Sequence, residues 1–217
     1  MARFKIKAIM TLLMTIKIWF LNNFKHVEIS VGKNCKIKNL KLASCGIGNV
    51  VNLGDNVILK NVSIKIFGNN NFIEIKNCNN LSEVRFVMED NENRIEIGEN
   101  TYIGEGTLLA ALEGKKINIG SDCMIAGPCE IRTSDSHSLL NGEGRRVNFG
   151  KDVIINDHCW IGTQCLILKG VNIPSNSVVA ARSLVLEMKA KVKNGTLIGG
   201  TPAKILKEEI NWYKERI

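Results

Sequence analysis

Large apolar residues recur at every sixth position over the last third of the chain. An unbroken series runs through Phe149, Ile155, Ile161, Ile167, Ile173, Val179 and Val185. A second slot, four positions further into each hexad, holds small residues: Val153, Cys159, Cys165, Val171, Ser177 and Ser183. A period of six is neither that of a half-buried strand nor that of a helix. Three hexads predict one turn of a triangular coil of about 18 residues, in which short parallel strands stack from turn to turn.

The same two slots recur upstream with less regularity. The clearer runs are Ile97, Ile103 and Leu109 with Thr101 and Thr107, and Ile119, Ile125 and Ile131 with Cys123 and Cys129. Weaker runs are Val31 and Ile37, and Ile47, Leu53 and Leu59 with Val57 and Ser63. Residues 65–95 keep only fragments such as Phe67 and Ile73, so the pattern does not fix their register. We expect an all-β coil domain over residues 26–200, with about seven or eight turns.

The repeat is interrupted over residues 132–148. The large slots there hold His137 and Glu143, and the segment is polar and contains glycine. The pattern then resumes in phase, so we expect a loop or a deformed coil that exposes polar side chains. Such departures from local consistency are where functional sites are expected.

The two ends of the chain lack the hexad pattern. Residues 3–24 are apolar with basic flanks, and the 1–25 segment is predicted to be an amphipathic helix that packs or makes oligomer contacts. A weak contact with a membrane surface through residues 3–24 is the alternative. Residues 201–217 follow Gly199-Gly200 and are predicted to form a short capping helix that starts near Pro202.

Composition narrows the class of ligand. The chain has 217 residues and a formal net charge of +8, which indicates an anionic ligand or surface. It has no long run of Lys and Arg and no zinc-finger spacing, so nucleic acid is not expected as a partner. The seven cysteines form no CxxC pair, and five of them (Cys35, Cys123, Cys129, Cys159 and Cys165) fall in the small inward slot. We interpret these five as core packing and the chain as reduced and cytoplasmic, with no bound metal.

Three histidines are available for acid–base chemistry. An imidazole titrates near neutral pH and is the natural general base there. His137 lies in the polar break beside Asp135, whereas His158 sits at a corner of a regular hexad and His26 precedes the first coil. From position alone, His137 is the candidate base and His158 a surface corner residue.

An ordered set of motifs in the last 40% of the chain resembles a known family. The matching stretches are Ser134-Asp135-Ser136-His137-Ser138, Val153 to Gly162, Ile167-Leu168-Lys169-Gly170-Val171, Ser177 to Val185 and Gly199-Gly200-Thr201-Pro202-Ala203-Lys204-Ile205. They resemble the hexapeptide-repeat acyltransferases, in the branch of maltose or galactoside and of sialic-acid or capsular-polysaccharide O-acetyltransferases. The resemblance implies a left-handed coil, although parallel crossovers are normally right-handed.

The resemblance also implies a chemistry. His137 would be the base that takes a proton from a sugar hydroxyl, whose oxygen attacks acetyl-CoA directly in a ternary complex. Asp135 or Asn141 would orient the imidazole, and Trp160 would line the acceptor and thioester site. No nucleophilic cysteine is needed. The implied product is an acetylated sugar or polysaccharide of the surface or capsular kind.

Further residues match the family's coenzyme site. Thr163 and Ala181 match positions along the pantetheine arm, and Lys204 and Lys207 match basic residues near the CoA phosphates. Arg182 departs from the family pattern and adds a charge that would contact phosphate or narrow the tunnel. The family forms homotrimers, in which His137 of one subunit would face Trp160 of its neighbour.

Three other functions compete with this interpretation. The first is N-acetylation of an amino-sugar nucleotide with the same fold and base. The second is a zinc enzyme of the carbonic-anhydrase type, which needs three histidines at an interface, and His26 lies too far along the coil. The third is a non-catalytic scaffold, against which Trp160 and the ordered C-terminal motifs argue. Acceptor choice is expected to depend on loop residues outside these motifs.

Overall fold

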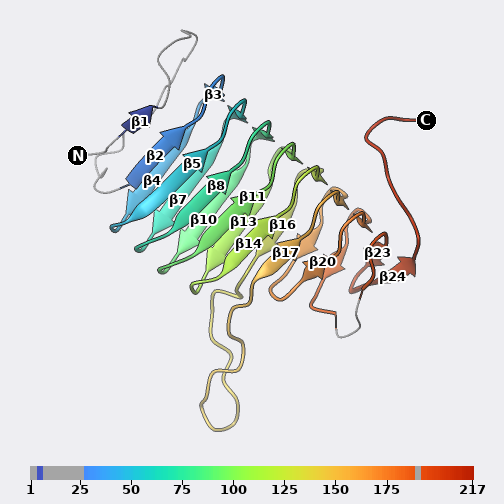
Figure 1. The fold of residues 1–217 in the computed structure, drawn as a ribbon. Helices are drawn as coiled ribbons and strands as arrows, with labels where there is room; N and C mark the ends of the chain where they lie inside the picture. Colours follow the sequence, from blue (N-terminus) through green and yellow to red (C-terminus); the bar gives the residue numbers. More distant parts are fainter. Residues whose placement is uncertain (1–3, 7–26, 189–191) are drawn as a thin grey trace.

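The protein is a stack of triangular coils (Figure 1). The computed structural model describes residues 4–6, 27–188 and 192–217. Each coil contributes one short strand to each of three sheets, and the strands of successive coils pair in parallel. The described residues contain 24 strands and no helix. This confirms the all-β parallel coil.

The three sheets are called sheets A, B and C. Sheet A contains β1 (Phe4–Ile6), β2 (Val27–Val31), β5 (Asn49–Leu53), β8 (Phe72–Ile75), β11 (Arg94–Ile97), β14 (Lys116–Ile119), β17 (Val153–Ile155) and β20 (Asn172–Ile173). Sheet B contains β3 (Lys36–Lys38), β6 (Ile58–Lys60), β9 (Asn80–Ser82), β12 (Tyr102–Ile103), β15 (Met124–Ile125), β18 (Trp160–Ile161), β21 (Val178–Val179), β23 (Leu197–Gly200) and β24 (Ala203–Lys207). Sheet C contains β4 (Lys41–Cys45), β7 (Ser63–Phe67), β10 (Arg85–Glu89), β13 (Leu108–Leu112), β16 (Glu130–Arg132), β19 (Leu166–Ile167) and β22 (Leu184–Val185). We name the corners by the sheets they join, so the C–A corner leads from sheet C to the next strand of sheet A.

Coil length differs between the two halves of the stack. Equivalent residues such as Asn49 and Asn71 are 22 apart in the first half. Residues Ile155 and Ile173 pair across adjacent strands in the second half, which gives the expected 18. In the longer coils, sheets A and C each carry one additional inward residue, and each additional inward residue needs an outward neighbour because side chains alternate along a strand. Two such pairs account for the four additional residues of each coil.

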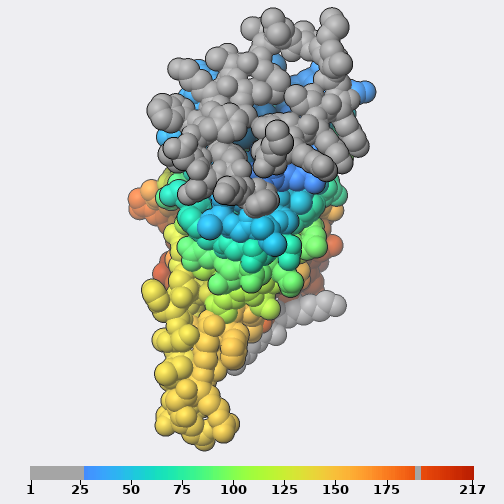
Figure 2. Space-filling model, turned by 90° about the vertical axis from the view of Figure 1, so that its left-hand side faces the viewer, coloured from blue at the N-terminus to red at the C-terminus, as the bar shows by residue number. Residues whose placement is uncertain are grey.

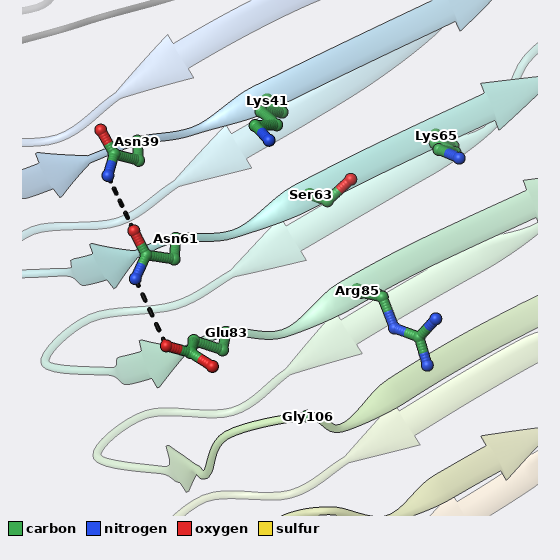
Figure 3. A pocket seen from close by; sticks show the side chains of 8 residues that line it. All are labelled: Asn39, Lys41, Asn61, Ser63, Lys65, Glu83, Arg85 and Gly106. Carbon is green, nitrogen blue, oxygen red and sulfur yellow. Dashed lines mark hydrogen bonds between the residues drawn. The ribbon is translucent and has the colours of Figure 1, made fainter.

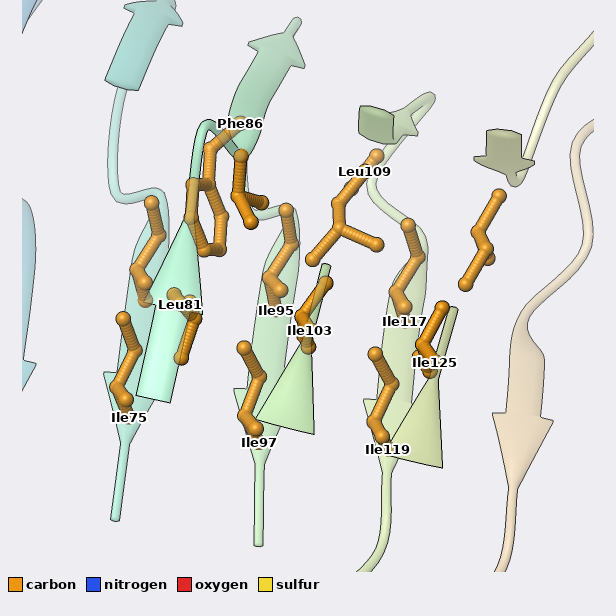
Figure 4. Packing of buried hydrophobic residues seen from close by; sticks show 14 of the residues in the cluster. Ile75, Leu81, Phe86, Ile95, Ile97, Ile103, Leu109, Ile117, Ile119 and Ile125 are labelled. Carbon is orange, nitrogen blue, oxygen red and sulfur yellow. The ribbon is translucent and has the colours of Figure 1, made fainter. Parts of the chain in front are cut away.

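The interior is a set of aliphatic columns (Figure 4). Ile75, Ile97 and Ile119 stack along sheet A, and Ile103 and Ile125 stack along sheet B. These side chains are almost fully buried. Burying one such side chain stabilises the fold by about 1.5–3 kcal/mol, and repetition of the same contact in every coil builds a mainly aliphatic core, to which Phe86 adds a buried ring.

The cysteine prediction is confirmed for four residues and modified for a fifth. Cys123, Cys129, Cys159 and Cys165 are buried, whereas Cys35 is only partly buried. Burial is the largest influence on the pKa of the Cys35 thiol and raises it. The two cysteines outside the pattern, Cys45 and Cys78, are exposed.

Several positions assigned inward by the hexad pattern face outward. Phe149 is 61% exposed, because the coil resumes at Val153 and Phe149 belongs to the segment before it. Ile47 is 59% exposed. Phe67, in the stretch whose register the pattern did not fix, is 48% exposed. Ser63 points outward on β7. In the longer coils, which have 22 residues, a count of six residues loses register with the strands. The count therefore placed Ile47 and Ser63 in inward slots that they do not occupy.

The prediction of a C-terminal capping helix is also wrong. Residues Ala203–Lys207 form β24, which runs antiparallel to β23, and residues 208–217 form no helix. The edge of sheet B offers unpaired backbone groups, and pairing with β24 satisfies them. Of the predicted N-terminal helix, residues 4–6 instead form β1, which pairs with β2. Its remaining residues lie outside the described part, and the left-handed sense stays a prediction from the resemblance.

Candidate active site

The polar break forms an arm that leaves the coil at the C–A corner (Figures 1 and 2). Across it the spacing of equivalent residues rises to 36, so one coil contains an insertion. The arm comprises residues 133–150, and its base closes where the Lys151 amide donates to the Thr133 carbonyl at 2.9 Å. Its tip is a turn in which the Asn141 side chain accepts from the amides of Glu143 and Arg145. Asn141 therefore shapes the tip.

Glu113 anchors the base of the arm to the preceding coil. Its carboxylate accepts hydrogen bonds from Ser134 Oγ, from Arg146 Nη2 at 2.6 Å and from the Gly150 amide at 3.0 Å. Burial opposes the charge, but these donors outweigh burial and lower the pKa of Glu113 to about 2. Glu113 is therefore ionised over the whole physiological pH range, and its three partners come from both the outgoing and the returning segment of the arm.

A second anchor joins the arm to the following coil. The Asp135 carboxylate pairs with Lys169 Nζ and accepts from Asn148 Nδ2 at 2.8 Å. The Lys169 bond is the largest influence on the pKa of Asp135 and lowers it. Asn148 also donates to the His137 carbonyl at 2.7 Å, which fixes the backbone of His137.

His137 is exposed on the arm, directly beyond these two anchors. The residue before it, Ser136, has φ = 66°, a conformation in which a non-glycine residue needs support from its surroundings. That support comes from the Ser136 amide, which donates to Ser134 Oγ at 3.0 Å. Among the described residues no hydrogen bond joins the imidazole to Asp135 or Asn141, so the expected orienting pair is not formed within one chain. The arrangement presents a free imidazole on a fixed backbone.

Trp160 lies elsewhere, on the outer face of sheet B. It is 38% exposed, and its ring is tilted against that of Trp212 with centroids 6.1 Å apart. Trp212 also stacks on His158 at 4.6 Å and donates from Nε1 to the His158 carbonyl at 2.8 Å. The His158 Nε2 atom lies 3.1 Å from the Trp212 carbonyl oxygen. His158 thus holds the C-terminal tail in place.

The candidate coenzyme residues gather at the B–C corner and on β24. The Arg182 amide donates to the Thr163 carbonyl, so Thr163, Ala181 and Arg182 lie on adjacent coils. Thr163 Oγ1 donates to the Gly127 carbonyl at 2.7 Å, and Arg182 Nε donates to Gln164 Oε1 at 2.6 Å. Ala181 and Arg182 are exposed. Lys204 and Lys207 are exposed on β24, which pairs with β23 beside this corner.

One chain does not bring these groups together at a single point. His137 leaves from the C–A corner, Trp160 from sheet B and Arg182 from the B–C corner. Sequence reasoning assigned no role to Glu113, Asn148, Lys169 or Trp212. Only Lys169 carried a signal, since it lies inside a recognised motif. Glu113 and Trp212 act through partners far away in the chain, whereas Asn148 acts within the arm.

A metal site and a membrane-spanning helix each place requirements on the described residues. No group of three His, Cys, Asp or Glu side chains there could hold a metal ion. His26 lies outside the described residues. In the part of the chain that the structure describes, no helix is long and apolar enough to span a bilayer.

Comparison with known proteins finds acetyltransferases that are similar in sequence and in fold. No family model matches the chain. The chain is 36% identical over 118 residues to a polysialic acid O-acetyltransferase of Neisseria meningitidis, which covers 53% of each chain. The chain thus spans about half the length of the curated relatives it matches.

Two solved structures match over more of the chain. The polysialic acid O-acetyltransferase OatWY is 32% identical, with 87% of this chain and 92% of that chain covered and a TM-score of 0.68. The polySia-specific acetyltransferase NeuO is 28% identical, with 82% and 90% covered and a TM-score of 0.66. The shared coil therefore extends through the longer turns as well as the hexads.

Proposed function

The chain belongs to the hexapeptide-repeat β-helix acetyltransferases, and from that membership we propose an acetyl-CoA-dependent O-acetyltransferase that acts on a sugar or polysaccharide hydroxyl. The observation that carries the proposal is the exposed imidazole of His137, whose backbone is fixed at the anchored base of the arm. A general base needs a free ring nitrogen that a substrate hydroxyl can reach, and a backbone that holds the ring in place.

His137 acts as the base in the proposed reaction. It takes the proton of the acceptor hydroxyl while the oxygen attacks the thioester carbonyl of acetyl-CoA. The C–S bond breaks as the C–O bond forms, and the CoA thiolate receives the proton from the imidazolium. Bringing both substrates together supplies much of the rate gain, and no covalent enzyme intermediate is required.

The coenzyme is proposed to bind beside the B–C corner. Thr163 and Ala181 would line its pantetheine arm, and Arg182, Lys204 and Lys207 would face its phosphates. The exposed cationic side chains and the small side chain of Ala181 at the B–C corner fit an anionic, elongated ligand.

A homotrimer would complete the site. His137 and Trp160 lie on different sides of one chain, so a neighbouring copy would have to supply the indole that faces each imidazole. Cyclic threefold symmetry suits a three-sided prism. Sedimentation of the purified protein at several concentrations tests this part of the proposal.

The proposed acceptor is an acidic polysaccharide of the polysialic acid kind. Both similar structures are described as polysialic acid acetyltransferases, and the chain carries a surplus of positive charge. N-acetylation of an amino-sugar nucleotide would use the same base and is the competing enzyme activity. A non-catalytic scaffold is the competing binding function.

The test is a transfer assay with a panel of acceptors. The protein is incubated with acetyl-CoA and with polysialic acid, a neutral polysaccharide, a free sugar or an amino-sugar nucleotide, and thiol release is followed. We expect turnover with polysialic acid, and a loss of about 10²–10⁴-fold in the His137→Ala variant. Ser138→Ala, a neighbour on the same arm, is the matched control and keeps its activity. A His137→Ala variant that assembles and transfers acetyl at the full rate would remove the base assignment.

A further inference from the structure

A groove of about 890 Å³ lies on sheet C in the first half of the stack (Figure 3). Its lining comes from β4, β7 and β10 and from the adjoining B–C corner: Asn39, Lys41, Asn61, Ser63, Lys65, Glu83, Arg85 and Gly106. None of these residues belongs to the candidate active site. The groove is therefore a separate feature of the longer coils.

The shape of the groove follows from the register of the strands. Ser63 pairs with Lys41 on one side and with Arg85 on the other, so a short side chain stands between two long ones. Adjacent strands are about 4.8 Å apart, which places the two cationic positions roughly 10 Å apart along the stack. At its far end Gly106 carries no side chain, and the groove stays open.

A ladder of amide side chains forms the rim at the B–C corner. Asn39 Nδ2 donates to Asn61 Oδ1 at 2.8 Å, and Asn61 Nδ2 donates to Glu83 at 3.4 Å. These groups are exposed, so their remaining hydrogen-bonding capacity is available to a ligand. Lys38 and Lys60 pair in register immediately beside the ladder on sheet B.

The cations of the groove are not neutralised. Lys41, Lys65 and Arg85 form no ion pair with a carboxylate among the described residues, and Glu83 is the one acid in the lining. The longer coils as a whole, residues 27–114, hold nine Lys and Arg against eleven Asp and Glu. Positive charge is therefore concentrated on this face rather than spread over a basic region.

The B–C corner connects the groove with the candidate coenzyme residues. Backbone hydrogen bonds run from each coil to the next along this corner. In the groove they join Lys60 to Glu83 and Glu83 to Gly106. Further along the stack they join Pro128 to Gln164 and Thr163 to Arg182. Three coils separate Gly106 from Arg182, or about 15 Å at the spacing of adjacent strands. The strand that leads into the arm, β16, lies two strands beyond β10 in sheet C.

We propose that this groove binds a carboxylate-bearing polysaccharide and holds a distant part of the polymer chain while another part is acetylated. Lys41, Lys65 and Arg85 pair with carboxylates, and Asn39, Asn61 and Ser63 hydrogen-bond to hydroxyls. An open groove accepts a chain that continues beyond both ends, which an enclosed pocket would not. The inference rests on the proposed function for its choice of polymer.

Direct binding tests the inference without any transfer reaction. Fluorescently labelled polysialic acid is titrated with the full chain in the absence of acetyl-CoA. The Lys41→Gln/Arg85→Gln variant should bind roughly five- to tenfold more weakly, since two exposed charge contacts are lost. The control is Lys33→Gln/Lys76→Gln, which removes the same charge from exposed positions outside the groove and should bind as the parent does. Equal affinities for the two double variants would overturn the groove.

Transfer kinetics separate this inference from the proposed function. In the Lys41→Gln/Arg85→Gln variant, KM for long polysialic acid should rise by the same factor, while kcat and KM for a short oligomer stay unchanged. A protein that binds the polymer through the groove but transfers no acetyl would overturn only the proposed function. Groove-dependent binding of phosphatidylserine vesicles, with no binding of the polymer, would overturn the polysaccharide assignment.

Discussion

The C–A corner is built differently in the two halves of the stack. In the longer coils it is closed from inside by the buried amides Asn49, Asn71 and Asn93. In the shorter coils the same corner has lost the additional inward residues, and the arm with His137 leaves from it. These three amides form a buried ladder at the C–A corner. Its last amide, Asn93, accepts from the Lys115 amide, and the next coil carries the insertion. Closing the corner and extending it into an arm are thus two uses of one position in the repeat.

The ladder replaces hydrophobic contact with hydrogen bonds. Asn71 Oδ1 accepts from the backbone amide and the side chain of Asn93, at 3.0 and 2.9 Å. Asn71 Nδ2 in turn donates to Asn49 Oδ1 and to the Asp90 carbonyl. A corner needs polar partners because the turning backbone cannot satisfy itself, and buried backbone groups without partners are costly.

The largest effect is expected from breaking this ladder. Asn71→Ala leaves the buried Asn93 amide without an acceptor and should lower the free energy of unfolding by about 3 kcal/mol. Urea unfolding followed by circular dichroism measures it. Asn69→Ala is the matched control, because its hydrogen bonds to Ile47 and Asn91 are exposed and water can replace them. A loss of similar size in both variants would show that the buried ladder is not what closes the corner.

A smaller effect is expected at the junction of the two regions. Glu113→Gln removes the charge that three donors of the arm share, so the arm should detach at its base while the coil stays folded. We expect faster proteolysis of the arm and a fall in kcat of about tenfold, with little change in KM for acetyl-CoA. Glu143→Gln, at the exposed tip, is the control and should leave both unchanged.

The same anchor has a predictable pH dependence. The pKa of Glu113 is lowered from 4.5 to about 2. Its contribution to holding the arm on the coil is therefore complete above pH 4.5 and disappears as the pH falls through about 2. Hydrogen exchange in the arm, corrected for intrinsic rates, should rise over this window in the parent and rise less in Glu113→Gln, where Asp135 is the anchoring carboxylate that still titrates. An arm that is equally protected at pH 5 and pH 2 would contradict Glu113 as the anchor.

The difference between the regions also explains what the sequence could predict. The strict hexads from Val153 to Val185 are all in their predicted slots, because two inward residues per side keep the period at six. Where sheets A and C carry a third inward residue the period changes within each coil. Ile47 was therefore assigned inward although it is exposed, and the register of residues 65–95 was not fixed. The anchors of the arm were not predictable, since Glu113 meets Arg146 across 33 residues and Gly150 across 37. The break itself was visible because polar residues filled large slots.

The smallest effect is expected in a column of small residues that the two regions share. At the A–B corner Thr101, Cys123, Cys159 and Ser177 succeed one another, and the column also makes hydrogen bonds. Thr101 Oγ1 accepts from the Cys123 amide at 3.1 Å, and Cys159 Sγ donates to the Pro174 carbonyl at 3.2 Å. The cysteines therefore act as weak hydrogen-bonding groups as well as packing residues.

On this basis Cys159→Ser should lower the free energy of unfolding by less than about 1 kcal/mol. Cys159→Ala leaves the Pro174 carbonyl unpaired and should lower it by more. If the slot were purely apolar, the order would be reversed, because a buried hydroxyl without a partner is worse than a methyl group. Thermal unfolding of the two variants side by side decides between these orders.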